Sequence, residues 1–143
     1  MSTKPIPEGY HTVTPYFTVD HATKLIDFLK EAFDAEVCEI SEAGGVVFNA
    51  EVKIGNSMIM IADTRGRIPA GRSMMYLYVN NADDAYARAV EAGGRPVMAP
   101  TDQFYGDRSG GVEDPCGNQW WVATHIKDVS PEEIAHYAQQ NKG

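Results

Sequence analysis

The fold is decided by residues 14–37, TPYFTVDHATKLIDFLKEAFDAEV, together with residues 74–97, MMYLYVNNADDAYARAVEAGGRPV. In each stretch, a run rich in aromatic or β-branched residues leads into the period of an amphipathic helix. Identical residues recur at one constant shift: Tyr16 and Tyr76, Val19 and Val79, Ala22 and Ala82, Glu31 and Glu91, Ala32 and Ala92, Val37 and Val97. An internal repeat of this kind indicates two copies of one supersecondary unit.

A second match follows each copy. The pair Gly55-Asn56 precedes the apolar run 57–61, and the pair Gly117-Asn118 precedes the apolar run 119–123. Each copy therefore predicts a strand, a helix and further strands. Two such units can place two sheets so that they enclose a cup, and the residues that line the cup then decide what the protein can do.

The composition is that of one soluble globular domain. The chain has 143 residues, of which 43% are hydrophobic and 22% are charged. Its net charge of −8 disfavours nucleic acid and anionic membrane surfaces, because both need clustered Lys and Arg. We see no signal peptide or membrane-spanning segment, and two isolated cysteines, Cys38 and Cys116, are typical of reduced thiols. The expected compartment is the cytoplasm.

Local patterns locate the secondary structure. We expect strands at residues 12–19, 35–41, 46–54, 57–62, 73–79, 95–99 and 118–124, and helices at residues 21–33 and 82–92. Asp20 is the expected N-cap of the first helix. The glycine-rich run 102–111 predicts a bulged strand with a flexible tip. Ser130-Pro131-Glu132-Glu133 has the pattern of a capping box and predicts a C-terminal helix.

The predicted fold class is α+β, with two βαβββ modules forming a curved mixed sheet around a cup, plus a C-terminal helix. We treat residues 1–143 as a single domain, with module one at about 10–63, module two at about 73–126 and the C-terminal helix at about 130–141. A ferredoxin-like βαββαβ arrangement is the alternative.

Four segments carry a resemblance to a known family: residues 9–16 (GYHTVTPY), 50–55 (AEVKIG), 102–108 (DQFYGDR) and 113–118 (EDPCGN). They resemble signatures of the glyoxalase/bleomycin-resistance/dioxygenase superfamily, also called vicinal oxygen chelate, in its PhnB-like branch. The family includes glyoxalases, ring-cleaving dioxygenases, epimerases, thiol transferases and antibiotic-sequestering proteins, so membership does not settle function. The resemblance also implies a homodimer in which modules complete each other's sites.

Metal-dependent members hold their ion with four His, Gln or Glu side chains at matching places of the two modules. When the internal repeat is used to align the two modules, the expected ligand positions fall in the first strand of each module and four residues after each turn glycine. The residues there are Thr14, Ile59, Met74 and Trp121. Since these side chains do not make a divalent oxygen or imidazole site, we expect no metal and no cofactor.

Strand alternation predicts the lining of the cup. If Thr14 and Met74 face inward, the neighbouring strands contribute a set of aromatic, aliphatic and polar side chains. The predicted lining consists of Thr14, Tyr16, Thr18, Asn49, Glu51, Ser57, Ile59, Ile61, Met74, Tyr76, Tyr78, Gln119, Trp121 and Ala123. Such a lining suits a flat or amphipathic organic molecule, held by stacking and oriented by a few polar contacts. Alternatively, the same rings fill the cup as a second core.

A few polar residues are candidates for chemistry. Glu51 is a candidate general base and His125 a further catalytic candidate, while Asn49 occupies a place where many PhnB-like relatives carry His. Asp107 and Arg108, beside Phe104 and Tyr105 in the segment that resembles a family motif, are candidates to gate or clamp a ligand, and Phe104 is a candidate ligand contact. The alternative for Asp107 and Arg108 is a local surface ion pair.

The main hypothesis is a metal-independent small-molecule-binding protein of the bleomycin-resistance type. The alternative is an enzyme of the same superfamily, of lyase, isomerase or dioxygenase type, with non-standard metal ligands or metal-free acid–base chemistry. A third possibility is a structural or regulatory dimer, which a filled cup would favour. We expect a small-molecule ligand and a homodimer partner, and neither nucleic acid nor membrane.

Overall fold

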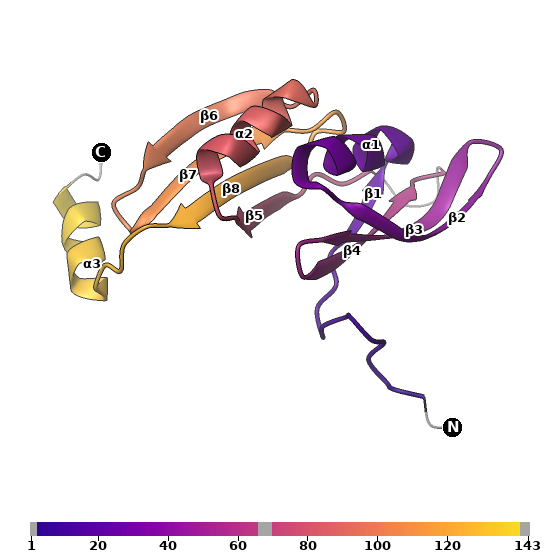
Figure 1. The fold of residues 1–143 in the computed structure, drawn as a ribbon, viewed down its shortest axis with the longest axis horizontal. Coiled ribbons are helices and arrows are strands. Elements are labelled where there is room, and N and C mark those ends of the chain that lie inside the picture. The colour runs from indigo at the N-terminus through magenta and orange to yellow at the C-terminus, as the bar shows by residue number, and fades with distance from the viewer. Residues whose placement is uncertain (1–2, 66–69, 141–143) are drawn as a thin grey trace.

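The computed structural model describes residues 3–65 and 70–140, which form two units of the same design and a tail helix (Figure 1). The first unit comprises β1 (Tyr16–Val19), α1 (Ala22–Phe33), β2 (Glu36–Ala43), β3 (Val46–Ile54) and β4 (Ser57–Asp63). The second comprises β5 (Met74–Tyr78), α2 (Ala82–Glu91), β6 (Arg95–Asp102), β7 (Asp107–Glu113) and β8 (Gln119–His125), and α3 (Pro131–Gln140) follows. The ends predicted for the domain, at 1 and 143, and for the tail helix, at 141, lie outside the described residues.

Each unit forms one four-stranded mixed sheet. The strand orders are β1-β4-β3-β2 and β5-β8-β7-β6. In both sheets the first and last strands of the unit are parallel, and the other neighbours are antiparallel. The predicted α+β class, with two βαβββ modules and a C-terminal helix, is confirmed. The described strands form two separate sheets, which no strand pairing joins into a continuous one.

Both module helices lie on the same side of the sheets, so the molecule has the form of an arch with the helices above (Figure 1). The two helices pack against each other where the modules meet. Arg88 of α2 donates through both terminal nitrogens to the carboxylate of Asp34, directly after α1, at 2.9 and 2.7 Å. This bidentate ion pair adds geometric specificity to the helix contact.

The core lies between the helices and the sheets and is shared by both modules. Phe17 of β1 and Trp120 of β8 are 2% and 1% exposed, and their rings stack with centroids 5.4 Å apart. Phe33 at the end of α1 packs against the same indole. These contacts confirm that Phe17 and Trp120 face the helices, as strand alternation predicts.

The last strand of each module anchors the helix of that module in the same way. Asp63 at the end of β4 accepts a hydrogen bond from the backbone N–H of Ala22, and Thr124 in β8 accepts one from the N–H of Ala82. The helix N-termini therefore gain a partner from a distant strand. The prediction that Asp20 is the N-cap of α1 is wrong, because His21 is at that position and its side chain makes no cap hydrogen bond.

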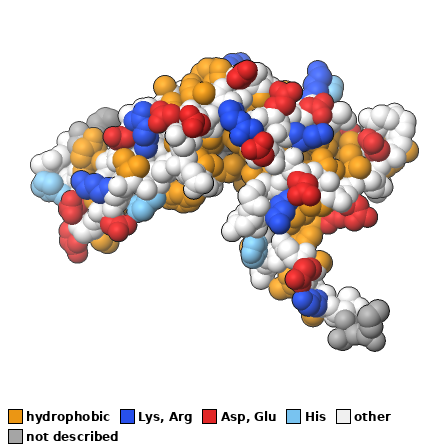
Figure 2. Space-filling model, in the orientation of Figure 1, with side chains coloured by type: hydrophobic (Ala, Val, Ile, Leu, Met, Phe, Trp, Pro, Cys, Tyr) orange, Lys and Arg blue, Asp and Glu red, His pale blue; other side chains and the backbone are white. Residues whose placement is uncertain are grey.

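The sheet faces opposite the helices look toward the underside of the arch, which the space-filling view shows open beneath (Figure 2). The structure of β7 contradicts the expectation of a flexible tip at the glycines of residues 102–111. Gly110 and Gly111 are buried within that strand and do not form a flexible tip. No described helix combines the length and apolarity needed to cross a membrane.

Candidate functional site

Aromatic side chains project from the helix-free face of the second sheet. Tyr76 and Tyr78 of β5 are 39% and 66% exposed, and Met74 on the same strand is 58% exposed. Trp121 of β8 lies opposite Tyr76 in the register of these parallel strands and is half-buried. The predicted inward set of module two therefore shares one face, and that face is open to solvent within a single protomer.

A buried carboxylate organises this face. Asp107, at the start of β7, is 3% exposed. One of its oxygens accepts hydrogen bonds from the Tyr76 hydroxyl at 2.7 Å and the Tyr78 hydroxyl at 2.9 Å. Its other oxygen lies 2.8 Å from Nδ1 of His125, whose Nε2 lies 2.7 Å from the exposed carboxylate of Asp128. These five side chains are called the Asp107 cluster below.

The strand order explains how these residues meet. In the order β5-β8-β7, the tyrosines and Asp107 are separated by β8, so the rings must cross that strand. Ala123 of β8 lies between Tyr78 and Ser109 in the register, and both Ala123 and Ser109 are buried. Because Ala123 of β8 and Ser109 of β7 are small, the phenol rings of β5 have room to lie across β8 and reach Asp107.

The cluster shifts the pKa values of its members in opposite directions. Burial raises the pKa of Asp107, but the hydrogen bonds from His125, Tyr76 and Tyr78 outweigh burial and hold it below its ordinary value. Burial and donation to Asp107 raise the pKa of Tyr76. The two carboxylates, Asp128 first and then Asp107, raise the pKa of His125. These shifts favour the ionised carboxylate and the protonated phenols, and they extend the pH range of the imidazolium upward.

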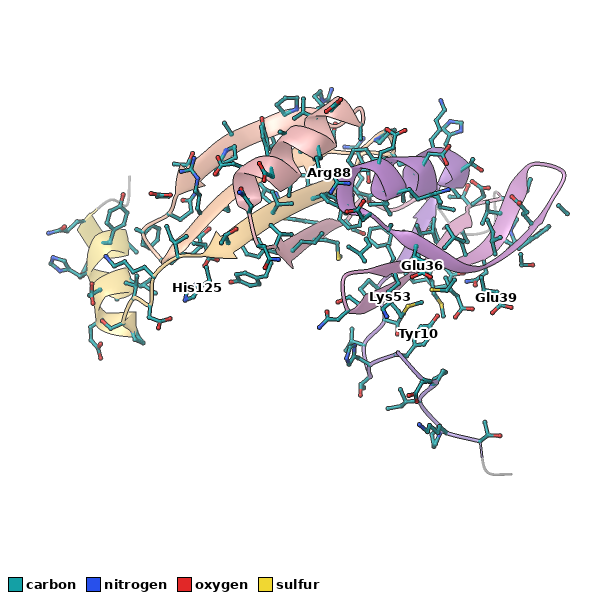
Figure 3. All side chains as sticks on the ribbon, in the orientation of Figure 1. Tyr10, Glu36, Glu39, Lys53, Arg88 and His125 are labelled. Atoms are coloured by element: carbon teal, nitrogen blue, oxygen red, sulfur yellow. The ribbon has the colours of Figure 1, made fainter. Side chains whose placement is uncertain are left out.

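The helix-free face of the first sheet carries a second polar group. The hydroxyl of Tyr10, in the segment before β1, donates to Glu51 of β3, and the side-chain amide of Asn49 donates to the Tyr16 hydroxyl at 3.3 Å. Burial, followed by the bond to Glu51, raises the pKa of Tyr10 to about 12. Figure 3 shows Tyr10 beneath β3 and β4 and His125 projecting below β8, so both groups lie on the underside of the arch.

Comparison with known proteins assigns the family. The model of the Glyoxalase/Bleomycin resistance protein/Dioxygenase superfamily matches residues 10–122. The chain belongs to this superfamily. An uncharacterized protein of Mycobacterium bovis is similar to the chain, being 32% identical over 134 residues that cover 85% of this chain and 88% of the relative. An uncharacterized protein of Mycobacterium tuberculosis is also 32% identical over 134 residues, and the aligned region covers 85% of this chain and 79% of that protein.

Solved structures share the fold of this superfamily member. TioX from Micromonospora sp. ML1 has a TM-score of 0.71 and 19% identity, with 81% of this chain and 99% of that chain covered. A gene product of Arabidopsis thaliana has a TM-score of 0.64 and 24% identity, with 80% of this chain and 98% of that chain covered. At these identities the likeness concerns the fold alone.

One of the superfamily positions inferred from the repeat was assigned to the wrong residue. Ile59 pairs with Val52 in the core and is 4% exposed, so it faces the helices and does not line the cup. Met60 pairs with Tyr16 as Trp121 pairs with Tyr76, which makes Met60 the counterpart of Trp121. Ile61 is likewise a core residue. The error arises because a two-residue turn precedes β4, whereas residues 114–118 connect β7 to β8.

The corrected donor set does not fit a divalent metal ion. Thr14 and Met60 of module one are the counterparts of Met74 and Trp121 of module two, and together they offer one hydroxyl, two thioethers and an indole. Within residues 3–65 and 70–140, no group of three or more His, Cys, Asp and Glu side chains is arranged to hold a metal.

Two residues predicted to clamp or contact a ligand lie away from the Asp107 cluster. Arg108 donates to Asp83 of α2 and to Asp102 of β6 at 2.8 to 3.0 Å, so its side chain is engaged in surface ion pairs. Phe104, in the loop before β7, stacks on Tyr137 of α3 with ring centroids 4.3 Å apart. Phe104 therefore docks the tail helix.

A groove of about 850 Å³ separates the two modules beside β5. Phe33, Ile54 and Ile59 line it from module one, while Leu77 and Trp120 line it from module two. Because β5 pairs only with β8 among the described strands, the groove borders an unpaired strand edge. The groove adjoins the Asp107 cluster, because Tyr76 and Tyr78 of the cluster line it, whereas Asp107 and His125 do not.

Sequence reasoning identified His125 and both tyrosines, and it singled out Asp107 as a loop residue beside Arg108, but it did not predict that Asp107 joins them. Asp107 sits in a glycine-rich run that reads as a surface loop, and its burial depends on the strand order. Tyr10 was missed. The alternation of polar residues on β3 had already placed Glu51 on the helix-free face, but no local pattern brings the N-terminal segment back across it.

Proposed function

We propose that the protein binds a flat or amphipathic organic molecule against the helix-free faces of its sheets, without a metal ion. The observation that carries this proposal is the set of exposed Tyr76 and Tyr78 rings and the half-buried Trp121 ring on the face that holds one buried, hydrogen-bonded carboxylate, Asp107. Rings supply broad apolar contact at low conformational cost, and the few polar atoms supply orientation. The corrected donor set supports binding without a metal.

Enclosure of a ligand requires a second surface, and we propose that a second copy of the chain supplies it. Tyr16, Tyr76 and Met74 are exposed within one protomer, and β1 and β5 have unpaired edges in the described residues. Exposed apolar faces and unpaired strand edges are common features of protein interfaces. The motifs that resemble the PhnB-like branch support assignment to that branch, for which such dimers are expected.

Tryptophan fluorescence tests ligand binding on this face. Trp121 is half-buried on the face, whereas Trp120 is 1% exposed in the core. Planar aromatic compounds are expected to raise the melting temperature and to quench Trp121 with matched dose dependence. The Trp121→Phe variant retains Trp120 and should keep a cooperative transition while losing the quenching. Indifference of the wild-type protein to every planar compound and antibiotic tried would refute the proposal.

A second candidate function is metal-free acid–base catalysis. The specific observation that favours it is the contact of a buried carboxylate with Nδ1 of His125, an arrangement that orients an imidazole for proton transfer. Elemental analysis of the purified protein separates both candidates from a metalloenzyme. Stoichiometric bound metal would contradict metal-independent binding and would favour an enzyme with unusual ligands.

A further inference from the structure

His125 lies between two carboxylates that differ in how firmly they are held. Asp107 has a 4% exposed side chain and is fixed by two tyrosine hydroxyls as well as by Nδ1 of His125. The side chain of Asp128 is fully exposed, and the contact described for it is the one with Nε2 of the same imidazole at 2.7 Å. Asp107 belongs to β7 of the sheet. Asp128 belongs to the segment before α3 and contacts the outer ring nitrogen of His125, Nε2.

We propose that the Asp128 carboxylate occupies the place of a ligand's carboxylate, and that Nε2–H of His125 is the anchor for an aromatic carboxylate. This inference rests on the proposed ligand-binding function and names its ligand class. The ring system of the ligand would lie against Tyr76, Tyr78 and Trp121, while its carboxylate would displace Asp128 from the imidazole.

The hydrogen-bond inventory supports an anionic ligand group. A neutral imidazole that donates from Nδ1 to Asp107 has only a lone pair at Nε2, whereas a carboxylate at 2.7 Å needs a proton there. The two contacts together describe an imidazolium, which favours an anion over a neutral amide. The hydroxyl protons of Tyr76 and Tyr78 are already donated to Asp107, so His125 remains the cluster's donor for a ligand carboxylate.

Displacing Asp128 is inexpensive. Its side chain is fully exposed, and ion pairs in such positions contribute little to stability because water competes for both partners. Displacing Asp107 would instead leave a buried carboxylate and two phenols without their partners. The difference in burial makes Nε2, and not Nδ1, the nitrogen available to a ligand.

The electrostatic surroundings of His125 make binding depend on pH. The described groups that face it are Asp107 of β7, the phenols of Tyr76 and Tyr78 of β5 behind Asp107, and Asp128 of the following segment. The carboxylates raise the pKa of His125, so the imidazolium persists above its ordinary range. Carboxylate binding should be strong below that raised pKa and decline as pH rises through it.

The decisive experiment compares 2-naphthoate with 2-naphthamide, which share a ring system and differ in charge. Each probe is titrated into the full-length chain by calorimetry and NMR between pH 5.5 and 8.5, in wild type, Asp128→Asn, His125→Gln and the control Asp27→Asn on the exposed face of α1. At pH 5.5, below the ordinary pKa of histidine, removing the competing carboxylate in Asp128→Asn should tighten naphthoate about two- to fivefold and leave naphthamide unchanged. His125→Gln should weaken naphthoate and abolish its pH dependence.

Each outcome bears on a different claim. Equal affinity for the two probes, or naphthoate affinity that ignores the Asp128→Asn change, overturns the anchor and leaves the proposed ligand-binding function standing. Binding of neutral planar compounds alone does the same. Failure of neutral and acidic planar compounds alike overturns the proposed function itself. Asp128 is fully exposed, so its variant remains a valid test even if His125→Gln fails to fold.

Discussion

At the scale of single residues, Asp107 is the group on which the site depends. It is buried, yet three side chains contact its two oxygens, so its charge is compensated. Satisfied buried carboxylates fix the rotamers of their partners. Tyr76 and Tyr78 therefore hold defined positions although their rings are exposed, and this order lowers the entropy that a ligand must overcome on binding.

Replacing Asp107 by Asn should expose this dependence. The amide can accept at one atom only, so at least one of the three donors loses its partner, and we expect a loss of about 1–3 kcal/mol in the free energy of unfolding. Tyrosine pKa values near the site should fall toward the ordinary range, since donation to the carboxylate raises them. Urea unfolding and ultraviolet titration measure both effects. Asp27→Asn is the control, and equal stability of the two variants would contradict the role of Asp107.

The contribution of His125 to stability should vary with pH in one direction. Its folded-state pKa is raised above the ordinary value of 6.5, so its stabilising contacts are fully present below pH 6.5 and are lost as pH rises through the folded-state pKa. The difference in unfolding free energy between wild type and His125→Gln should therefore shrink on going from pH 5.5 to 8.5. Denaturant titrations across this range provide the measurement, and a difference that grows with pH would reverse the assignment.

At the scale of elements, β7 contains glycines that a sequence pattern does not distinguish from the glycines of a turn. A Cβ added to Gly111 would lie 2.7 Å from ring atoms of Trp121, so this glycine gives room for the indole to lie across the strand. The run 102–111 was predicted to include a bulged strand and a flexible tip because glycine usually marks turns. In the structure, only residues 103–106 of this run lie between β6 and β7.

Gly111→Ala should displace the Trp121 ring. We expect the variant to lose about 1–3 kcal/mol of stability, because the added methyl group overpacks the face, and to lose the fluorescence response to planar ligands. Gly71→Ala serves as the control, since a Cβ there meets nothing within 4 Å and the backbone has no positive φ. An unchanged response in Gly111→Ala would show that Trp121 is not part of the ligand surface.

Element prediction succeeded where the pattern was local and failed where it depended on partners. The alternation of Val46–Ile54 placed β3 with its correct bounds. Phe48 departs from the alternation of this strand, being 39% exposed while Val47 is buried, because a register irregularity between β2 and β3 shifts the pleat. Ile59 was misplaced by a difference in turn length. Such errors of one residue reverse the face of a strand, so a site derived from a repeat needs the register.

At the scale of the whole molecule, the exposed apolar faces predict self-association. Met74→Arg places a charge on the β5 face that we propose to be covered by a second copy, so it should convert a dimer into monomers. Thr23→Arg, on the outer face of α1, should leave the mass unchanged. Light scattering coupled to gel filtration gives the result, and a wild-type protein that is monomeric at high concentration would refute the dimer.

The anchoring of each helix by the last strand of its own module has one more consequence. Asp63 fixes the start of α1, Thr124 fixes the start of α2, and each module completes its strand pairing internally. A break in the covalent chain between the modules would leave every one of these contacts intact. Two separately expressed halves, residues 3–65 and 70–140, should therefore reassemble through the Phe17–Trp120 stack, and the protein could serve as a split reporter whose reconstitution depends on that contact.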